Sequence, residues 1–308
     1  MKKNVFLKLA SALLVLCLAS TCAIGTTFAK YTTADSASDT ARVAKWGMVV
    51  STSGTLFGKY YAAHSATDAD KIVANVAYSV DTSDGAKIVA PGTKNDTGFQ
   101  VLVNGDPEVA YDVLADNGTG TTMEDIWLKA GNYGVMVLAH GINPATNFSG
   151  NDIYKSEDAQ NFTRVTTWEA LTGSYKYYRL HDVATTATDY YPIVWTVAKI
   201  GTAPDLTNTH LATVDGTAGI AKEIANNLTA LSGKANDEIN FGYTLTWEWK
   251  FSDGNDALDT ILGNLSAADA DQVVVKTTDS GATYAKVATS DYNLDINFEL
   301  NVTVNQVD

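Results

Sequence analysis

The sequence predicts an all-β fold, an antiparallel β-sandwich of jelly-roll type with an inserted helix and a long insertion. Three observations lead to this prediction. Runs of alternating apolar and polar residues recur along the chain, most clearly over 292–304. Clusters of Ser, Thr, Asn, Asp and Gly separate these runs, and the chain contains only five prolines. Over 217–232, apolar residues recur after four, four and three positions, which indicates one amphipathic helix.

Residues 1–29 have the three parts of a secretory signal peptide. A basic start precedes an apolar run over 9–24, and Thr27 and Ala29 are small residues at the two positions that signal peptidase recognises. We expect cleavage after Ala29, which makes Lys30 the first residue of a secreted chain. The apolar run is short for a membrane span of about 20 residues and is rich in Ser, Thr and Ala. The alternative is that this segment is not cleaved and stays on the chain as a membrane anchor.

Composition and charge narrow the class of protein. Both cysteines, Cys17 and Cys22, lie in the signal segment, so the exported chain is expected to have no disulfide and no cysteine metal site. Removal of three signal lysines leaves 18 basic and 35 acidic residues, which changes the formal net charge from −14 to −17. Such a surface repels nucleic acid and anionic lipid, so we expect no nucleic-acid partner and membrane contact only before cleavage.

The exported chain is expected to start with an arm and candidate first strand over 30–50, followed by a sandwich domain over 51–308. The arm is polar over 30–40 and apolar over 41–50. Turn chemistry is expected at 90–93 and again at 104–107, where the sequence is Asn-Gly-Asp-Pro. The strands expected here are 41–50, 71–80, 99–104 and 108–114, the last two as a hairpin.

Residues 117–190 have a less regular pattern, and we expect them to be an insertion in the sandwich. The elements predicted within it are a short helix over 123–130, a strand over 133–139, a long excursion over 143–161 and an aromatic-rich stretch over 168–180.

The last third of the chain returns to regular strands. We expect the alternating aromatic residues of 241–249 to lie in the core rather than to form a platform for carbohydrate. Gly233 is the expected C-cap of the 217–232 helix. The other elements predicted here are strands over 190–200, 238–251 and 292–304, a short helix over 256–266, and a hairpin of 272–276 with 283–288.

Three segments together resemble one family. Residues 25–33 and 41–47 (GTTFAKYTT and ARVAKWG) are similar to the signal and mature N-terminus of proteins processed by a SipW-type signal peptidase. Residues 88–113 resemble the strand-turn-strand element of the TasA/camelysin family of Gram-positive bacteria, and 244–264 resemble a late strand and loop in its clostridial members. The resemblance is good over roughly 40–115 and 238–304 and poor over 117–190.

This resemblance implies a secreted structural subunit of extracellular fibres in biofilm matrix. Fibres of this family form by donor-strand exchange, in which the N-terminal segment of one subunit completes a sheet of the next. A free sheet edge offers unpaired backbone groups to such a strand, and a head-to-tail contact that does not close builds a filament. The alternative is that 30–50 is an ordinary first strand of its own domain. The candidate contact residues are Ala41, Val43, Trp46, Met48 and Val50.

The sequence is also compatible with two other functions. The first is a monomeric cell-surface adhesin or ligand-binding module that uses 117–190 as its binding face. The second is an extracellular metallopeptidase, an activity with which camelysin-like proteins have been labelled. The sequence lacks the H-E-x-x-H zinc motif and the G-x-S-x-G motif, so we expect no enzymatic activity. The four histidines are far apart in sequence: His64, His140, His181 and His210.

No cofactor is expected, with calcium as the one candidate ion. Asp253, Asn255, Asp256 and Asp259 form an oxygen-rich stretch, and Ca²⁺ takes about six to eight oxygen ligands. Their spacing is not that of an EF-hand loop. The alternative is that these residues serve turn and helix-cap chemistry, in which Asp and Asn accept hydrogen bonds from free backbone N–H groups.

Overall fold

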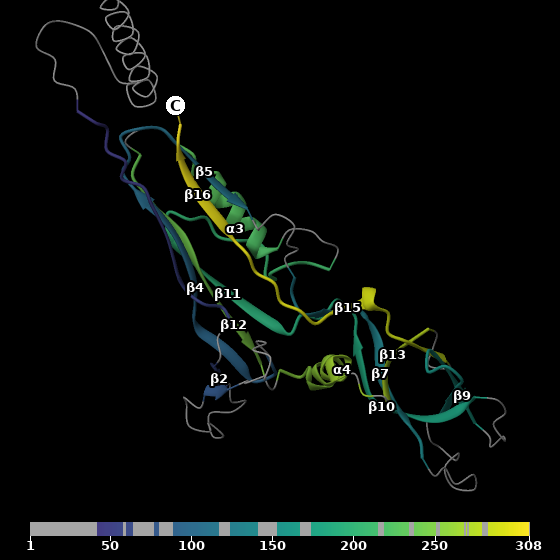
Figure 1. Ribbon diagram of the computed structural model, residues 1–308. Helices are drawn as coiled ribbons and strands as arrows, with labels where there is room; N and C mark the ends of the chain where they lie inside the picture. Colours follow the sequence, from purple (N-terminus) through teal and green to yellow (C-terminus); the bar gives the residue numbers. More distant parts are fainter. Residues whose placement is uncertain are drawn as a thin grey trace, which may run out of the picture. The chain divides into compact units, whose positions relative to one another are not determined.

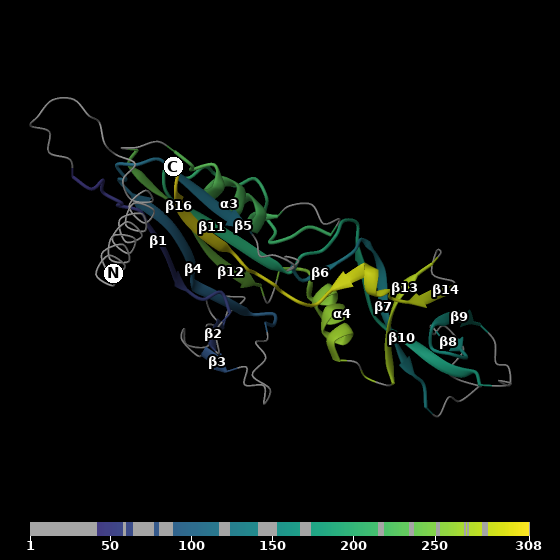
Figure 2. The same ribbon diagram turned by 45° about the horizontal axis from the view of Figure 1, so that its top comes forward.

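The structure is a computed structural model of the chain (Figure 1, Figure 2). The chain divides into two compact units, Met1–Lys45 and Trp46–Asp308, and every described helix and strand belongs to the second. These elements are predominantly β, with two α-helices, which confirms the predicted class. The described residues are 42–57, 60–63, 77–79, 89–116, 124–140, 153–166, 174–214, 219–233, 237–250, 253–267, 269, 271–278 and 283–307.

The larger sheet is built around β4 (Thr93–Gly105), which pairs antiparallel on both sides. One side pairs with β12 (Ile239–Trp249), which in turn pairs with β11 (Ile193–Gly201). The other side pairs with β1 (Val49–Gly54) and then with β2 (Tyr60–Ala63), to which β3 (Ala77–Ser79) is added. Figure 1 shows β4, β11 and β12 running side by side.

Alternate residues of β12 form the centre of the core. Tyr243, Leu245 and Trp247 are almost completely buried, and Phe241 and Trp249 lie on the same face. Burial of each side chain of this kind contributes about 1.5–3 kcal/mol. The aromatic face is therefore core, as predicted, and not an exposed platform.

A second, two-stranded sheet pairs β5 (Tyr111–Asp116) with β16 (Asn301–Gln306). Helix α3 (Ile220–Thr229) lies against β5, and its apolar face is buried, as its spacing predicts. The backbone N–H groups of Val113 and Ala115 donate to the hydroxyl oxygens of Ser232 and Thr229. Side chains at the C-terminal end of α3 thus satisfy backbone donors of β5.

The predicted hairpin of 99–104 with 108–114 is wrong, because β4 and β5 belong to different sheets. Both sides of β4 are taken by other strands, and β5 pairs with β16. Alternation shows which face of a strand is apolar, and turn residues show where the strand ends. Neither property specifies the partner strand.

Six further strands form a closed barrel in the order β10–β7–β13–β14–β9–β8. It has a core of its own that includes Met136, Tyr154, Phe162 and Tyr178. Within this barrel, β13 and β14 form the predicted hairpin. The bounds are β7 (Gly131–Leu138), β8 (Ile153–Ser156), β9 (Asn161–Val165), β10 (Lys176–Thr186), β13 (Gln272–Thr277) and β14 (Thr283–Lys286).

Residues 117–190 contribute more strands to the fold than the sequence predicts. Four of its strands come from this range, where the sequence predicts a single strand and a long excursion. The short helix expected over 123–130 is wrong. In its place β6 (Trp127–Leu128) pairs with β15 (Tyr292–Asn293), because backbone pairing to a distant segment outweighs local helical spacing.

Some predicted bounds differ from the observed ones at both ends of the chain. The strand expected over 41–50 begins only at Val49, and residues 42–48 have no regular structure. The strand expected over 292–304 is interrupted: between β15 and β16 only Asn297 forms an isolated bridge, to Glu124. The alternation of this segment still holds, since Leu294, Ile296, Phe298 and Leu300 are partly buried against the core.

Both longer helices are observed, with one correction at a cap. Helix α4 (Asp256–Ala267) confirms the helix expected over 256–266, and α3 ends at the C-cap Ala230 rather than at Gly233. Gly233 instead bridges to Tyr111, whose hydroxyl oxygen would lie 2.4 Å from a Cβ at this position. Neither α-helix of the described residues has the length and apolar character needed to cross a membrane.

We expect Gly242→Ala to lower the free energy of unfolding by about 1–3 kcal/mol. A Cβ at this position of β12 would lie 2.2 Å from the backbone carbonyl oxygen of Val101, so β4 and β12 would have to separate. The matched control is Gly263→Ala in α4, where no atom lies within 4 Å of the added Cβ. That change should raise the free energy of unfolding by about 0.5–1 kcal/mol, because Ala favours helix. Urea titration followed by tryptophan fluorescence measures both, and equal stability of Gly242→Ala and the parent chain would contradict the assignment.

Candidate functional site

The structure separates the candidate contact residues of the N-terminal segment into two groups. Met48 and Val50 pack against the core of their own domain, and Val50 lies opposite Val103 of β4. Val43 and Trp46 are exposed, with 93% and 41% of their surfaces accessible. Residues 49–54 are therefore a strand of their own sheet, whereas 42–48 carry exposed apolar side chains without a strand. Ala41, and the signal residues Thr27, Ala29 and Lys30, lie outside the described residues.

The extended segment 294–298 has one backbone side that is paired and one that has no backbone partner among the described residues. Asn297 exchanges two backbone hydrogen bonds with Glu124, at N···O distances of 3.0 and 3.2 Å. In an extended chain the backbone groups of successive residues point in opposite directions, so those of Ile296 and Phe298 point away from Glu124. Among the described residues, none forms a backbone hydrogen bond with Ile296 or Phe298. This side of the segment is therefore a short strand edge without a partner in the described part of the chain, called the free edge below.

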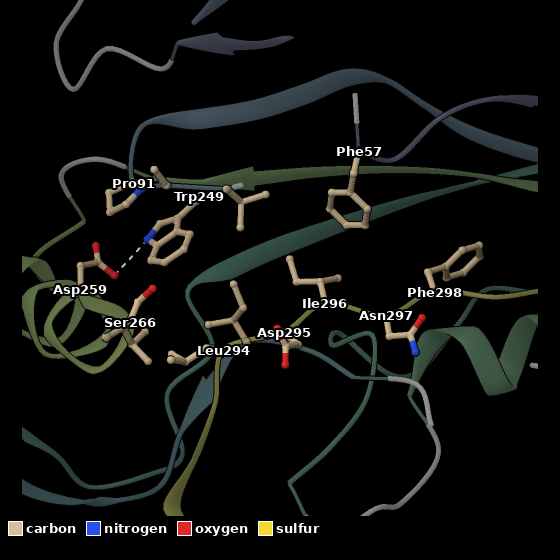
Figure 3. A pocket seen from close by; sticks show the side chains of 15 residues that line it. Phe57, Pro91, Trp249, Asp259, Ser266, Leu294, Asp295, Ile296, Asn297 and Phe298 are labelled. Carbon is tan, nitrogen blue, oxygen red and sulfur yellow. Dashed lines mark hydrogen bonds between the residues drawn. The ribbon is translucent and has the colours of Figure 1, made fainter. Parts of the chain in front are cut away.

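A cavity of about 630 Å³ lies beside this segment (Figure 3). The end of β12 contributes Trp249, the residues before β4 contribute Pro91, and α4 contributes Asp259 and Leu262. Figure 3 shows the side chains of Leu294 and Ile296 on the same side of the extended segment as Trp249 and Phe57. The walls thus combine apolar side chains with polar groups, among them Ser266, Asn297 and the carboxyl-bearing Asp259 of α4.

The carboxyl group of Asp259 is buried and only half satisfied. Its Oδ1 atom accepts hydrogen bonds from the Tyr190 hydroxyl (2.7 Å) and from Trp249 Nε1 (2.9 Å). Its Oδ2 atom is buried and has no hydrogen-bond partner. Burial raises the pKa of this carboxyl, and the negative charges of Asp253 and Asp256 raise it further, against the lowering effect of the two hydrogen bonds.

The four candidate calcium ligands have different surroundings. Asp253 and Asp256 are exposed, and Asp253 Oδ1 accepts a hydrogen bond from the backbone N–H of Asn255 (2.9 Å), which is turn chemistry. Asp259 instead directs Oδ1 to Tyr190 and Trp249 in the interior. The described part of the chain contains no group of three or more His, Cys, Asp or Glu residues that could hold a metal ion.

A second buried carboxyl, that of Asp125, has no counterpart in the sequence-based predictions. It is fully buried, and it accepts hydrogen bonds from Trp195 Nε1 (3.1 Å) and from the backbone N–H groups of Leu211 (2.9 Å) and Ile126 (3.0 Å). Burial raises its pKa to about 7, although these hydrogen bonds lower it. Through these hydrogen bonds, Asp125 links Trp195 of β11 to the backbone of Leu211. Its partners are distant in sequence, so no local pattern identifies it.

Stability should fall as the pH rises through the range in which Asp125 titrates. The folded protein holds this proton up to about pH 7, whereas the unfolded chain releases it near 3.8, the ordinary pKa of an aspartate. The folded state therefore binds more protons than the unfolded state between these values, and the group contributes about 2 kcal/mol less stability at pH 7 than at pH 5. Chemical denaturation of the parent chain and of Asp125→Asn measures this slope. The variant should be less stable overall but less dependent on pH; an unchanged pH slope would contradict the assignment.

Comparisons with protein families, with curated proteins and with solved structures find no match to this chain. The function therefore has to be inferred from the residues, the free strand edge and the cavity described above.

Proposed function

We propose that this chain is a secreted structural subunit of extracellular fibres, of the jelly-roll type and biofilm-matrix setting that the TasA/camelysin resemblance implies. In this proposal the N-terminal segment of one subunit adds to a sheet edge of the next. The observation that carries it is that Ile296 and Phe298, beside the cavity, have no backbone partner among the described residues. Export, cleavage after Ala29 by signal peptidase and an extracellular location belong to the same proposal.

The free edge has the properties of a strand acceptor. An added strand would satisfy backbone groups of Ile296 and Phe298, and each such hydrogen bond contributes about 0.5–1.5 kcal/mol. Alternate side chains of the added strand would enter the neighbouring cavity, as in other cases of strand addition. Leu294 and Ile296 already present apolar surface on that side.

The segment 42–48 has the properties of a donor. It has no regular structure, it exposes Val43 and Trp46, and it contains Arg42 and Lys45 but no acidic residue. The acceptor side carries Asp259 and Asp295, in a chain whose formal net charge after cleavage would be −17. Opposite charge favours the encounter of these two surfaces over other pairings.

The placement of β1 refines which residues would be exchanged. Val49–Gly54 already pairs with β4 of the same chain, so the donor is expected upstream of Val49. A donor and an acceptor at different places on one subunit make a head-to-tail contact, which does not close on itself and therefore builds a filament. Removal of the signal would free the chain ahead of the donor.

We expect the double variant Val43→Glu/Trp46→Glu to abolish filaments while leaving the subunit folded. Both side chains are exposed, so thermal stability and circular dichroism should match those of the parent chain. The matched control is Val183→Glu on β10, which changes another exposed valine and should leave filaments intact. Negative-stain electron microscopy of the protein recovered from the medium of an expressing host gives the measurement.

Filaments in the double variant at the parental density would show that 42–48 is not the donor. Monodisperse parent protein under all conditions would exclude the fibre proposal altogether and favour a monomeric surface module.

A further inference from the structure

We propose that the outward face of the large sheet is a self-association surface that pairs with the same face of a second copy of this chain. The inference goes beyond the proposed function, because strand exchange uses a strand edge whereas this contact uses a sheet face. It rests on the charge of this face, on the chemistry of its side chains and on the area that it offers.

The strand register defines the outward face across four strands. Residues directly opposite one another lie on the same face, so the rows that contain the buried Leu245 and Val103 point inward and the alternate rows point outward. We call the outward set the outer face. Its members are Val194, Thr196, Ala198 and Ile200 of β11, Asn240, Gly242, Thr244 and Thr246 of β12, Gln100, Leu102 and Asn104 of β4, and Val49, Ser51 and Ser53 of β1.

None of the described positions that form the outer face is charged. Charged residues make up 18% of the chain and lie almost entirely on protein surfaces, so their absence across four strands is a property of this face. The row at one end adds Glu248 and Lys94, which lie directly opposite each other, so their opposite charges cancel. Two copies of an acidic chain repel each other, and this face lets them approach without bringing like charges together.

The side chains of the outer face are complementary to themselves. Ser, Thr, Asn and Gln each donate and accept hydrogen bonds, so such a residue can pair with the same residue of a second copy. Pairing of this kind occurs within the face, where Ser53 Oγ donates to Gln100 Oε1 (3.3 Å) and Gln100 Nε2 donates to Thr244 Oγ1 (3.4 Å). Exposed valines of β11 and β1, Val194 (43% accessible) and Val49 (55%), add apolar surface. These properties fit a two-fold contact between identical faces.

The area of the outer face sets the strength of the contact. With strands about 4.8 Å apart and residues about 3.3 Å apart along each strand, the four strands present roughly 400 Å² per copy. A standard stable interface buries about 800 Å² per partner, so we expect weak and reversible pairing of single subunits. Along a filament the face would recur with every subunit, and many weak contacts would join two filaments side by side; this last step alone rests on the proposed function.

Sedimentation equilibrium of the double variant Val43→Glu/Trp46→Glu tests the inference, because these changes remove the proposed donor and leave the outer face intact. We expect a reversible dimer at protein concentrations up to about 1 mM. The dimer should become more stable when NaCl is raised from about 20 to about 200 mM, because salt screens the repulsion between two acidic chains. Monomer alone at both salt concentrations would overturn the inference.

A charge exchange at the centre of the face identifies the partner as a second copy. In the same background, Thr244→Lys and Thr244→Glu each place like charges near each other across a two-fold contact. Each variant alone should dimerise at least about tenfold more weakly, and an equimolar mixture of the two should recover the affinity. Circular dichroism and thermal unfolding show whether the variants fold as the background does.

The matched control is the same pair of changes at Thr303, an exposed residue of β16 outside the outer face. Thr303→Lys and Thr303→Glu should change the dimer Kd less than about twofold, and a loss equal to that of the Thr244 variants would contradict the assignment.

Failure of the mixture to recover dimers would overturn the two-fold pairing. Binding of the chain to insoluble cellulose or chitin, lost in both Thr244 variants and in their mixture, would then assign the face to a polysaccharide. Dimers of the background without filaments of the parent chain would support this inference and contradict the fibre proposal. Filaments of the parent chain without dimers of the background would do the reverse.

Discussion

The pairing of β12 with β4 is the interaction on which the rest of the structure depends. It joins strands that are far apart in the sequence and places the alternating aromatic face of β12 at the centre of the core. Trp247 at the middle of that face donates its indole N–H to the backbone carbonyl of Leu56 (2.7 Å) and so holds the chain after β1. Trp249 at its end donates to Asp259 and forms one wall of the cavity. The register of one strand pair therefore positions both the N-terminal strand and the candidate site.

The two buried carboxyls differ in how many of their oxygens accept hydrogen bonds. Asp125 receives three hydrogen bonds, which involve both of its oxygens, and lies where several segments meet. Asp259 receives two hydrogen bonds on one oxygen, and its other oxygen is buried and has no partner among the described residues. A satisfied buried carboxyl holds segments together, whereas an unsatisfied buried oxygen costs free energy that the surrounding contacts have to offset.

The segment 294–298 shows how a strand-like sequence can lack strand partners. Its apolar residues alternate and are partly buried, so its side chains behave as those of a sheet. Within the described residues, its backbone pairs at Asn297 alone between β15 and β16. Side-chain burial and backbone pairing are separate requirements of a strand, and the described residues meet only the first of them along most of this segment. That difference is the physical reason for placing the proposed acceptor at this segment.

Periodicity and turn chemistry by themselves determined the predominantly β class, the strands β4, β7, β11 and β12, the hairpin of β13 with β14, and both helices, because each depends on residues close together in sequence. Only the tertiary structure decided the rest. It placed β4 and β5 in different sheets, gathered residues of 117–190 into a barrel with β13 and β14, and converted the expected helix over 123–130 into β6. It also revealed the hydrogen bonds of two buried carboxyls. Asp125 accepts one from Trp195 and Asp259 accepts one from Tyr190, and each donor lies about 70 residues away in the sequence. Strand partners and buried polar contacts depend on which segments meet in space, and local sequence carries no information about such meetings.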